Sequence, residues 1–218
     1  MKNASPHVFF FTIGLVMTAG CASIGGSDMG FSYKNLPVAT GSATAGDGHT
    51  VTFKGTPLAL EGDGVKVGDQ LRDAQVAKND LSPVNIAETK GKVRIISIVP
   101  SLDTPVCEQQ THYLSEKNQG IDKNVELITI SVDTPFAQGR FAKEAKINNI
   151  IFLSDYRGAD FGKHYGLLVK DPHILARTVM VVDKDNVIRY LQVTPELAQL
   201  PDMDAAFTAA RSLASGSS

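Results

Sequence analysis

Two apolar segments rich in β-branched residues, each followed by a helix-capable stretch, constrain the fold of this chain more than any other feature. Residues 93–99 read VRIISIV and residues 125–132 read VELITISV. Such continuous runs are typical of strands that are covered on both faces of a sheet. Helix-capable stretches follow at residues 106–117 and 136–145. The alternation of strand and helix predicts an α/β fold.

Turn signals and hydrophobic patterns predict the remaining elements. In chain order they are a hairpin over residues 50–60 that turns at residues 54–57, a strand over 150–153, a helix over 159–165, two strands over 178–182 and 187–193 that are joined by a hairpin turn, and a closing helix over 202–213. Residues 215–218 are predicted to be a frayed tail.

A lone cysteine lies where the first apolar strand gives way to a helix. The connecting run is PSLDTPVC, residues 100–107, so Cys107 is expected at or near the first turn of the helix. Unpaired backbone N–H groups and the positive end of the helix dipole favour a thiolate there, and the thiolate is the reactive form of cysteine. This context indicates sulfur chemistry. The alternative is a cysteine that only fills space in the core.

The spacing Pro-x-x-x-Thr-x-x-Cys, formed by Pro100, Thr104 and Cys107, resembles the active-site signature of the peroxiredoxins. The resemblance is closest to the bacterial thiol peroxidase subfamily and extends over most of the chain from Thr50 to Leu213. The segments that carry it are VTFKGTPL at 51–58, IVPSLDTPVC at 98–107, ISVDTPFAQGRF at 130–141, LAR at 175–177 and PDMDAA at 201–206. It implies a thioredoxin-like fold, with a central mixed sheet flanked by helices and an N-terminal β-hairpin.

The same resemblance implies that Cys107 is the peroxidatic nucleophile and that Thr104 and Arg177 are its partners. A threonine hydroxyl can hold and polarise a peroxide oxygen, and the Pro100 ring can exclude solvent. Arg177 stands at the start of the strand over 178–182, where it can supply the cation that the thiolate needs. The plain alternatives are that Thr104 is only a helix cap and that Arg177 is a surface ion-pair residue.

The chain departs from the subfamily at one position. The subfamily usually carries a resolving cysteine directly after an Arg-Phe pair, whereas here Arg140 and Phe141 are followed by Ala142. The chain has 2 cysteines, Cys21 and Cys107. An internal disulfide of the family kind is therefore not expected, and the reductant should be an external thiol, either a thioredoxin-like protein or a small thiol.

The N-terminus predicts a lipoprotein. Lys2, a short apolar run at residues 8–17 and small residues before Cys21 are typical of a secretory signal over residues 1–20. The Ala-Gly-Cys boundary resembles a lipobox, which implies a lipid on Cys21. In a Gram-negative bacterium, Ala22 after the cysteine would favour sorting to the outer membrane. The alternative is an ordinary signal peptide in which Cys21 is incidental.

The predicted organisation follows from this N-terminus. A lipidated cysteine and a flexible linker are expected over residues 21–48, and the folded domain over residues 49–214. The predicted location is the bacterial cell envelope, with the domain anchored by lipid on the periplasmic face of a membrane.

Composition excludes several other function classes. Lys and Arg number 21 against 23 Asp and Glu, with no Trp, so no nucleic-acid partner is expected. The five histidines lack metal-ligand spacing, so no metal or cofactor is expected. Besides a peroxidase, a thiol–disulfide carrier and a catalytically impaired binding lipoprotein remain as hypotheses, although a carrier would need a Cys-x-x-Cys pair. The sequence allows a homodimer.

Overall fold

The computed structural model describes residues 1–2, 30–88 and 91–216, and the chain divides into two units, Met1–Gly30 and Phe31–Ser218. The predicted signal peptide, Cys21 and the first part of the predicted linker lie outside the described residues. The second unit, Phe31–Ser218, carries the fold described.

A mixed sheet of seven strands forms the centre of this unit, in the order β11-β10-β5-β6-β7-β3-β4. Strand β5 pairs in parallel with β6, and β6 in parallel with β7, whereas the other pairs in this sheet are antiparallel. The strands are β3 (Gln75–Ala77), β4 (Pro83–Asn85), β5 (Val93–Ile98), β6 (Val125–Ser131), β7 (Ile151–Ser154), β10 (Thr178–Val182) and β11 (Ile188–Val193).

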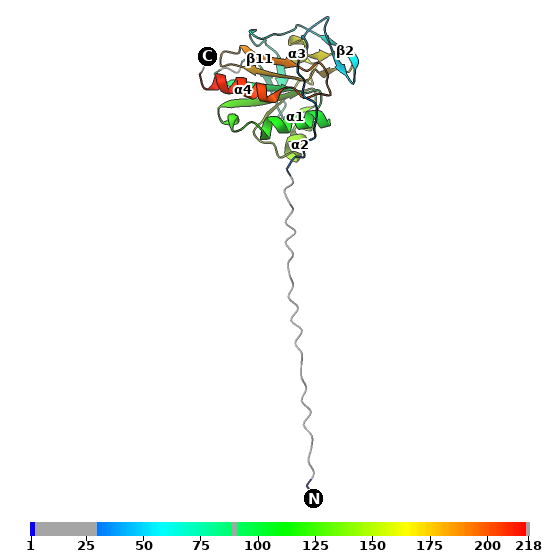
Figure 1. Ribbon diagram of the computed structural model, residues 1–218, viewed down its shortest axis with the longest axis vertical. Helices are drawn as coiled ribbons and strands as arrows, with labels where there is room; N and C mark the ends of the chain where they lie inside the picture. Colours follow the sequence, from blue (N-terminus) through cyan, green and yellow to red (C-terminus); the bar gives the residue numbers. More distant parts are fainter. Residues whose placement is uncertain (3–29, 89–90, 217–218) are drawn as a thin grey trace. The chain divides into compact units, whose positions relative to one another are not determined.

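The two faces of the sheet have different covers. One face packs against helices α1 (Pro105–Glu116), α2 (Pro135–Glu144) and α4 (Met203–Ala214). The other face packs against α3 (Asp160–His164) and a small sheet of strands β1 (Thr50–Phe53), β2 (Thr56–Glu61), β8 (Leu168–Val169) and β9 (Ile174–Leu175). A short 3-10 helix, η1 (Ile121–Lys123), precedes β6. Figure 1 shows α1, α2 and α4 on one side of the sheet and α3 with β2 on the other.

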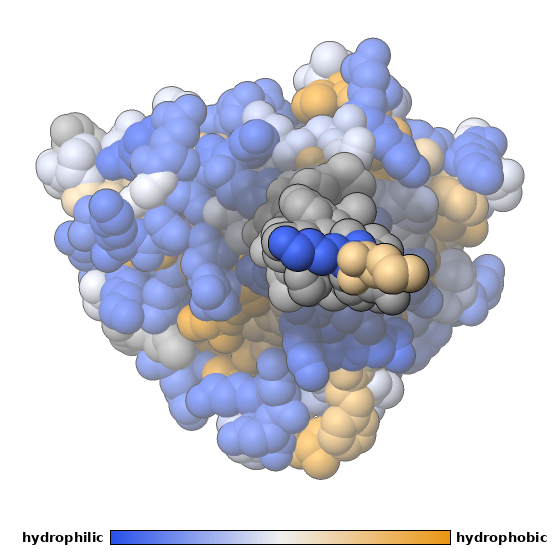
Figure 2. Space-filling view, turned by 90° about the horizontal axis from the view of Figure 1, so that it is seen from below, coloured by the Kyte–Doolittle hydropathy of each residue, from blue (hydrophilic) through white to orange (hydrophobic). Residues whose placement is uncertain are grey.

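The covered faces explain why the central strands are mostly apolar on both sides. Side chains alternate between the faces of a strand. In β5, Val93 and Ile95 enter the core under α1, α2 and α4, whereas Ile96 and Ile98 enter the core under α3. The outer surface is mostly hydrophilic in the view of Figure 2, with apolar side chains in small separate groups.

Helix boundaries follow local capping rules. Pro105 begins α1 and Pro135 begins α2. Proline is favoured at the first position of a helix because a backbone N–H there would have no partner within the helix. The Thr134 side chain accepts a hydrogen bond from Ala137 N at the start of α2, and the Asp202 side chain accepts one from Ala205 N at the start of α4.

The predicted thioredoxin-like fold with its mixed sheet and N-terminal hairpin is confirmed. Every predicted helix and strand is present, with ends that differ by one or two residues. Four strands were not predicted, namely β3, β4, β8 and β9. Each has two or three residues, which is too short for a periodic signal.

The predicted flexible linker over residues 21–48 is wrong for residues 31–48. Ala39 N donates to Leu200 O at 2.8 Å, and Ala43 N donates to Val193 O at 2.8 Å on the outer edge of β11. Ala39 and Ala45 are buried. Small side chains allow this close approach, and the open edge of the sheet supplies hydrogen-bond partners that composition alone does not reveal.

Candidate active site

Cys107 is the third residue of α1 and belongs to the apolar core on that side of the sheet. Its relative exposure is 0%. Strand β5 ends at Ile98, and a turn through Pro100 and Thr104 leads into the helix. The predicted position of the cysteine in the first turn is therefore correct, and the helix dipole favours negative charge on its sulfur.

The guanidinium of Arg177 lies beside the sulfur. Arg177 stands directly before β10 and is 2% exposed. Its Nη2 donates to Cys107 Sγ at 3.4 Å, and its Nε donates to Leu197 O at 2.9 Å. The surface ion-pair alternative is therefore wrong for Arg177, because its partners are buried groups of the core.

Gln110 holds the third donor of this guanidinium. Arg177 Nη1 donates to Gln110 Oε1 at 2.8 Å, and Gln110 Nε2 donates to Ser97 Oγ at 2.8 Å. All of these side chains are buried. Sequence analysis missed Gln110. The available signal was its place three residues after Cys107, on the same helix face.

Thr104 lies in the same turn but does not bond the sulfur. It is exposed, its hydroxyl donates to Ser101 O at 3.0 Å, and its side chain makes no cap hydrogen bond to α1. The structure therefore supports neither a side-chain cap nor a direct Thr104–Cys107 hydrogen bond among the described residues. A hydroxyl that donates still has lone pairs with which to accept. Pro100 is buried at the end of β5.

Asp133 fixes the turn that leads to the cysteine. One of its oxygens accepts from Ser101 Oγ at 2.8 Å and the other accepts from Leu102 N at 2.7 Å. Asp133 follows β6, so the turn is bonded to the neighbouring parallel strand at its carboxyl end. Sequence analysis missed this residue, since nothing local in the sequence links positions 101 and 133.

The chemistry of the site is that of a buried sulfur with a fixed cation. Within the described ranges Cys107 is a free cysteine, and no group of three His, Cys, Asp or Glu side chains could hold a metal ion. Ala142, at the position where a second cysteine is usual in the resembling subfamily, is a partly buried residue of α2. The arrangement suits a nucleophilic thiolate and not a metal centre.

Comparison with known proteins places the site in a family. The redoxin family matches residues 66–207. A thiol peroxidase from Halalkalibacterium halodurans is 43% identical over 162 residues, which is 74% of this chain and 97% of that protein. The chain belongs to the thiol peroxidase family of peroxiredoxins.

Two further relatives of this peroxiredoxin agree. A thiol peroxidase from Streptococcus pneumoniae is 40% identical over 163 residues, which is 75% of this chain and 99% of that protein. The crystal structure of a peroxiredoxin-like protein from Aquifex aeolicus is 38% identical with a TM-score of 0.70, and the match covers 75% of this chain and 96% of that one. This peroxiredoxin is therefore an enzyme of the thiol-dependent peroxidase class.

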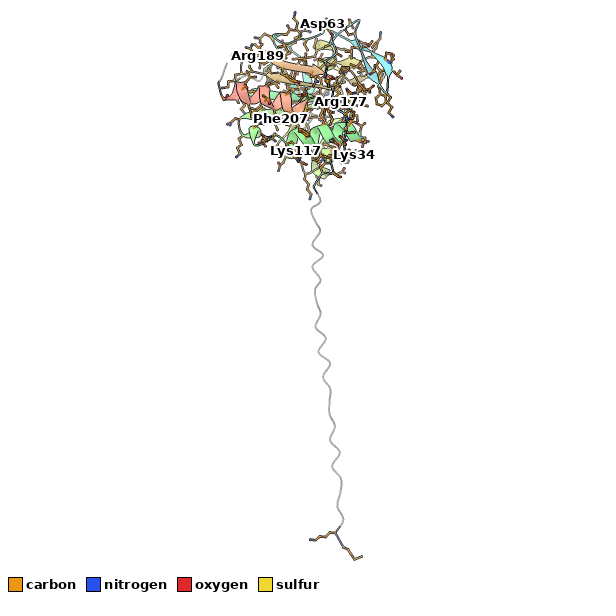
Figure 3. The ribbon with its side chains drawn as sticks, viewed as in Figure 1. Lys34, Asp63, Lys117, Arg177, Arg189 and Phe207 are labelled. Carbon is orange, nitrogen blue, oxygen red and sulfur yellow. The ribbon has the colours of Figure 1, made fainter. Side chains whose placement is uncertain are left out.

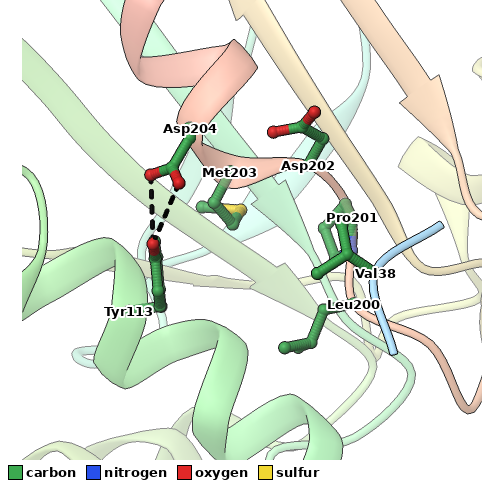
Figure 4. A pocket seen from close by; sticks show the side chains of 7 residues that line it. All are labelled: Val38, Tyr113, Leu200, Pro201, Asp202, Met203 and Asp204. Atoms are coloured by element: carbon green, nitrogen blue, oxygen red, sulfur yellow. Dashed lines mark hydrogen bonds between the residues drawn. The ribbon is translucent and has the colours of Figure 1, made fainter. Parts of the chain in front are cut away.

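A pocket of about 140 Å³ lies beside the start of α4 (Figure 4), and neither Cys107 nor Arg177 lines it. It is lined by Val38, Tyr113, Leu200, Pro201, Asp202, Met203 and Asp204. Asp202 caps α4 and Asp204 accepts from the Tyr113 hydroxyl at 3.0 Å, so both carboxylates already have partners within the fold.

In the described part of the chain no helix is long and apolar enough to cross a membrane.

Proposed function

We propose that this chain reduces hydrogen peroxide and alkyl hydroperoxides through Cys107 alone and that an external thiol restores the enzyme. The observation that carries the proposal is the 3.4 Å contact between Arg177 Nη2 and Cys107 Sγ in the first turn of α1. A fixed guanidinium and a helix N-terminus both favour the thiolate, and both act on charge that develops in the transition state.

The first step forms a sulfenic acid. The Cys107 thiolate attacks one oxygen of the peroxide, the O–O bond breaks, and the other oxygen leaves as hydroxide or alkoxide and takes up a proton. The sulfur is oxidised and the peroxide is reduced to water or an alcohol. Arg177 stabilises the sulfur before attack and the departing oxyanion during it.

Thr104 and Pro100 have supporting roles in the proposal. The Thr104 hydroxyl lies in the turn before α1, where a small rotation lets it hold a peroxide oxygen, and its present bond to Ser101 O keeps it in that turn. Pro100 is buried and offers no N–H, so it excludes water without competing for the substrate.

The later steps need a thiol from outside the chain, because Ala142 stands where the subfamily carries its second cysteine. One external thiol condenses with the sulfenic acid to give a mixed disulfide and water. A second thiolate then attacks that disulfide, which frees Cys107 as a thiolate and releases the oxidised reductant as a disulfide.

The proposal places the enzyme in the bacterial cell envelope, anchored through a lipid on Cys21. The short apolar run at residues 8–17 and the Ala-Gly-Cys boundary support it. If Cys21 carries a thioether to lipid, its sulfur cannot resolve Cys107. Peptide mapping of the oxidised native protein tests both points, since a Cys21–Cys107 disulfide as the main product contradicts the anchor and the one-cysteine cycle together.

Peroxide consumption by the full chain tests the function. We expect turnover with a thiol donor, none for Cys107→Ser, and unchanged turnover for Cys21→Ser in detergent. Intact-mass analysis after one equivalent of peroxide should show one added oxygen, located on Cys107. If Cys107 stays a thiol while methionines oxidise, the alternative of a catalytically impaired binding lipoprotein replaces the proposal.

A further inference from the structure

The segment Phe31–Lys34, called the strap below, lies along the helix that carries Cys107. The side chain of Gln109 binds both backbone polar groups of Lys34. Lys34 N donates to Gln109 Oε1 at 2.8 Å, and Gln109 Nε2 donates to Lys34 O at 2.8 Å. Gln109 is two residues after Cys107 and is 4% exposed. Figure 3 labels Lys34 and Lys117 beside α1.

Aromatic contacts extend the strap over the rest of the helix. The Phe31 ring stacks on His112, with centroids 3.9 Å apart and planes at 12°. The Tyr33 ring meets Tyr113 edge-on, with centroids 6.1 Å apart. Lys117 Nζ lies 4.8 Å from the Tyr33 centroid. Each is a favourable geometry for an aromatic pair or a cation over a ring.

A charged acceptor completes the contact. The Tyr33 hydroxyl donates to Glu116 Oε2 at 2.8 Å, and His112 Nδ1 lies 2.6 Å from Glu116 Oε1. Burial works to raise the pKa of Glu116, but the hydrogen bonds from His112 and Tyr33 outweigh it and hold the pKa below its ordinary value. The strap thus binds three successive turns of α1.

The strap is an addition to the domain that the relatives share. The two curated thiol peroxidases described above are matched over 97% and 99% of their length by about three quarters of this chain. Only residues 208–218 follow the redoxin match, so most of the unmatched quarter precedes residue 66. Residues 31–34 fall in that part.

Because the sulfur of Cys107 is buried, the strap affects how an external thiol can reach it. Cys107 has no exposed surface, and a thiol has to reach it from outside the chain. For a thiol larger than a peroxide, the first turns of α1 have to move, and the strap opposes that movement because it bonds the helix immediately after the cysteine.

We propose that the strap sets the access of external thiols to Cys107 by holding α1 closed, and so determines which reductants the enzyme accepts. A bound strap admits peroxide and small thiols in preference to bulky ones, and its release exposes the sulfur. The consequence for reductant choice rests on the proposed function, whereas the access of a reagent to the sulfur does not.

Alkylation of the reduced full chain tests the proposal without any need for peroxidase activity. We expect Phe31→Ala combined with Tyr33→Ala to speed labelling of Cys107 by N-ethylmaleimide at least tenfold, with the label assigned by peptide mapping. Backbone amides of residues 105–116 should exchange with deuterium faster as well. Phe53→Ala is the matched control, because Phe53 is an exposed aromatic residue on the hairpin and, among the described residues, makes no ring contact with α1.

A milder variant keeps the test decisive if the double variant does not fold. Tyr33→Phe removes only the hydroxyl that bonds Glu116 and should speed labelling by a smaller factor. Labelling and exchange equal to wild type in a folded variant overturn the proposal. Faster labelling in an enzyme that consumes no peroxide leaves the strap as the gate and contradicts the proposed function alone.

Discussion

Two arginines are buried in this domain, on neighbouring strands or strand ends of the same sheet, and they face different partners. Arg177 donates to a sulfur, an amide oxygen and a carbonyl. Arg94, on β5, donates to Ile86 O at 2.9 Å and to the side-chain oxygen of Asn186. Burial lowers the pKa of Arg94, yet a guanidinium stays charged at neutral pH.

The difference shows that a buried cation alone does not identify a site. Arg94 lies on the side of the sheet away from Cys107. Its guanidinium donates to oxygens of Ile86 and of Asn186, which lies in the β10–β11 turn, and so links these two segments. Arg177, in contrast, has a nucleophile, the sulfur of Cys107, among its partners. We therefore expect substitution of Arg94 to lower the free energy of unfolding, and substitution of Arg177 to lower the rate of reaction with peroxide.

The largest expected effect is on stability, for Arg94→Ala. This substitution takes a charged donor away from the oxygens of Asn186 and Ile86. Hydrogen bonds to a charged group are worth about 2 kcal/mol each, so we expect a loss of about 4 kcal/mol of unfolding free energy. Urea unfolding measures it. The folded fraction should react with peroxide within about twofold of wild type, because no transition-state contact is lost.

The matched control is Arg189→Ala. Arg189 is half exposed and pairs with Asp183 at 2.6 Å, so its loss should cost below about 1 kcal/mol. A peroxide rate that falls in Arg94→Ala as far as in Arg177→Ala would remove the distinction between the two buried arginines.

Asp155 extends the comparison to a buried acid without a cation in hydrogen-bond contact. It is 2% exposed, and its oxygens accept from Phe161 N at 3.0 Å and Gly162 N at 2.8 Å. Burial raises its pKa from 3.8 to about 6 despite those bonds. Its contribution to stability is therefore complete below about pH 4 and is lost as pH rises through about 6.

We expect wild type to lose up to about 3 kcal/mol relative to Asp155→Asn between pH 4 and pH 7, from a shift of roughly two pH units. Urea unfolding of both proteins across this range measures the difference. Asp80→Asn is the control of opposite sign: hydrogen bonds from Ser82 lower the pKa of Asp80, so that contribution is lost as pH falls. A pH-independent difference for Asp155→Asn contradicts the assignment.

Arg177→Ala should reduce the second-order rate with peroxide about a hundredfold, or about 2.7 kcal/mol in barrier. Stopped-flow measurement at fixed pH provides the rate, and circular dichroism checks the fold. Arg177→Lys should recover only part of it, because one ammonium cannot reach Leu197, Gln110 and the sulfur at once. An unchanged rate in folded Arg177→Ala excludes this residue from the site.

The smallest effect is expected for Gln110→Leu. The guanidinium keeps its charge but loses the acceptor that aims it, so we expect about a tenfold slower reaction, or about 1.4 kcal/mol. Gln138→Leu is the matched control: Gln138 is also fully buried, but it bonds Ser131 and Leu153 on the α2 side and does not contact Arg177. Equal rates for the two variants would show that Gln110 does not position Arg177.

The sequence predicted the parts of this molecule that local rules determine. Residues 93–99 are predicted as a strand because the run is mostly apolar and rich in β-branched residues. Cys107 is predicted at the start of a helix because a helix-capable stretch follows that strand. Cys107 is singled out by its place between strand and helix, and Arg177 by its place at the start of a strand. The family resemblance then implies their roles and that of Thr104. The structure brings Cys107 and Arg177 together and leaves Thr104 in the turn without a bond to the sulfur.

The parts that sequence could not predict depend on contacts between distant positions. Asp133 fixes a turn 31 residues before it, and Gln109 bonds a backbone 75 residues away. Residues 31–48 belong to a stretch rich in Gly, Ser, Ala and Thr that resembles a linker. Their partners are distant in the sequence and include the open edge of β11, the outer face of α1 and the loop at Gly166.

The strap also changes the mechanics of the proposed anchor. With the chain docked from residue 31, nine residues, 22–30, lie between the strap and Cys21, so the two can be at most roughly 35 Å apart. If residues 21–48 were a flexible linker, the domain could reorient freely and a force on the anchor would not act on contacts within the domain. If Cys21 carries the proposed lipid, a pull from the membrane would act first on the contacts between the strap and α1, the helix that carries Cys107.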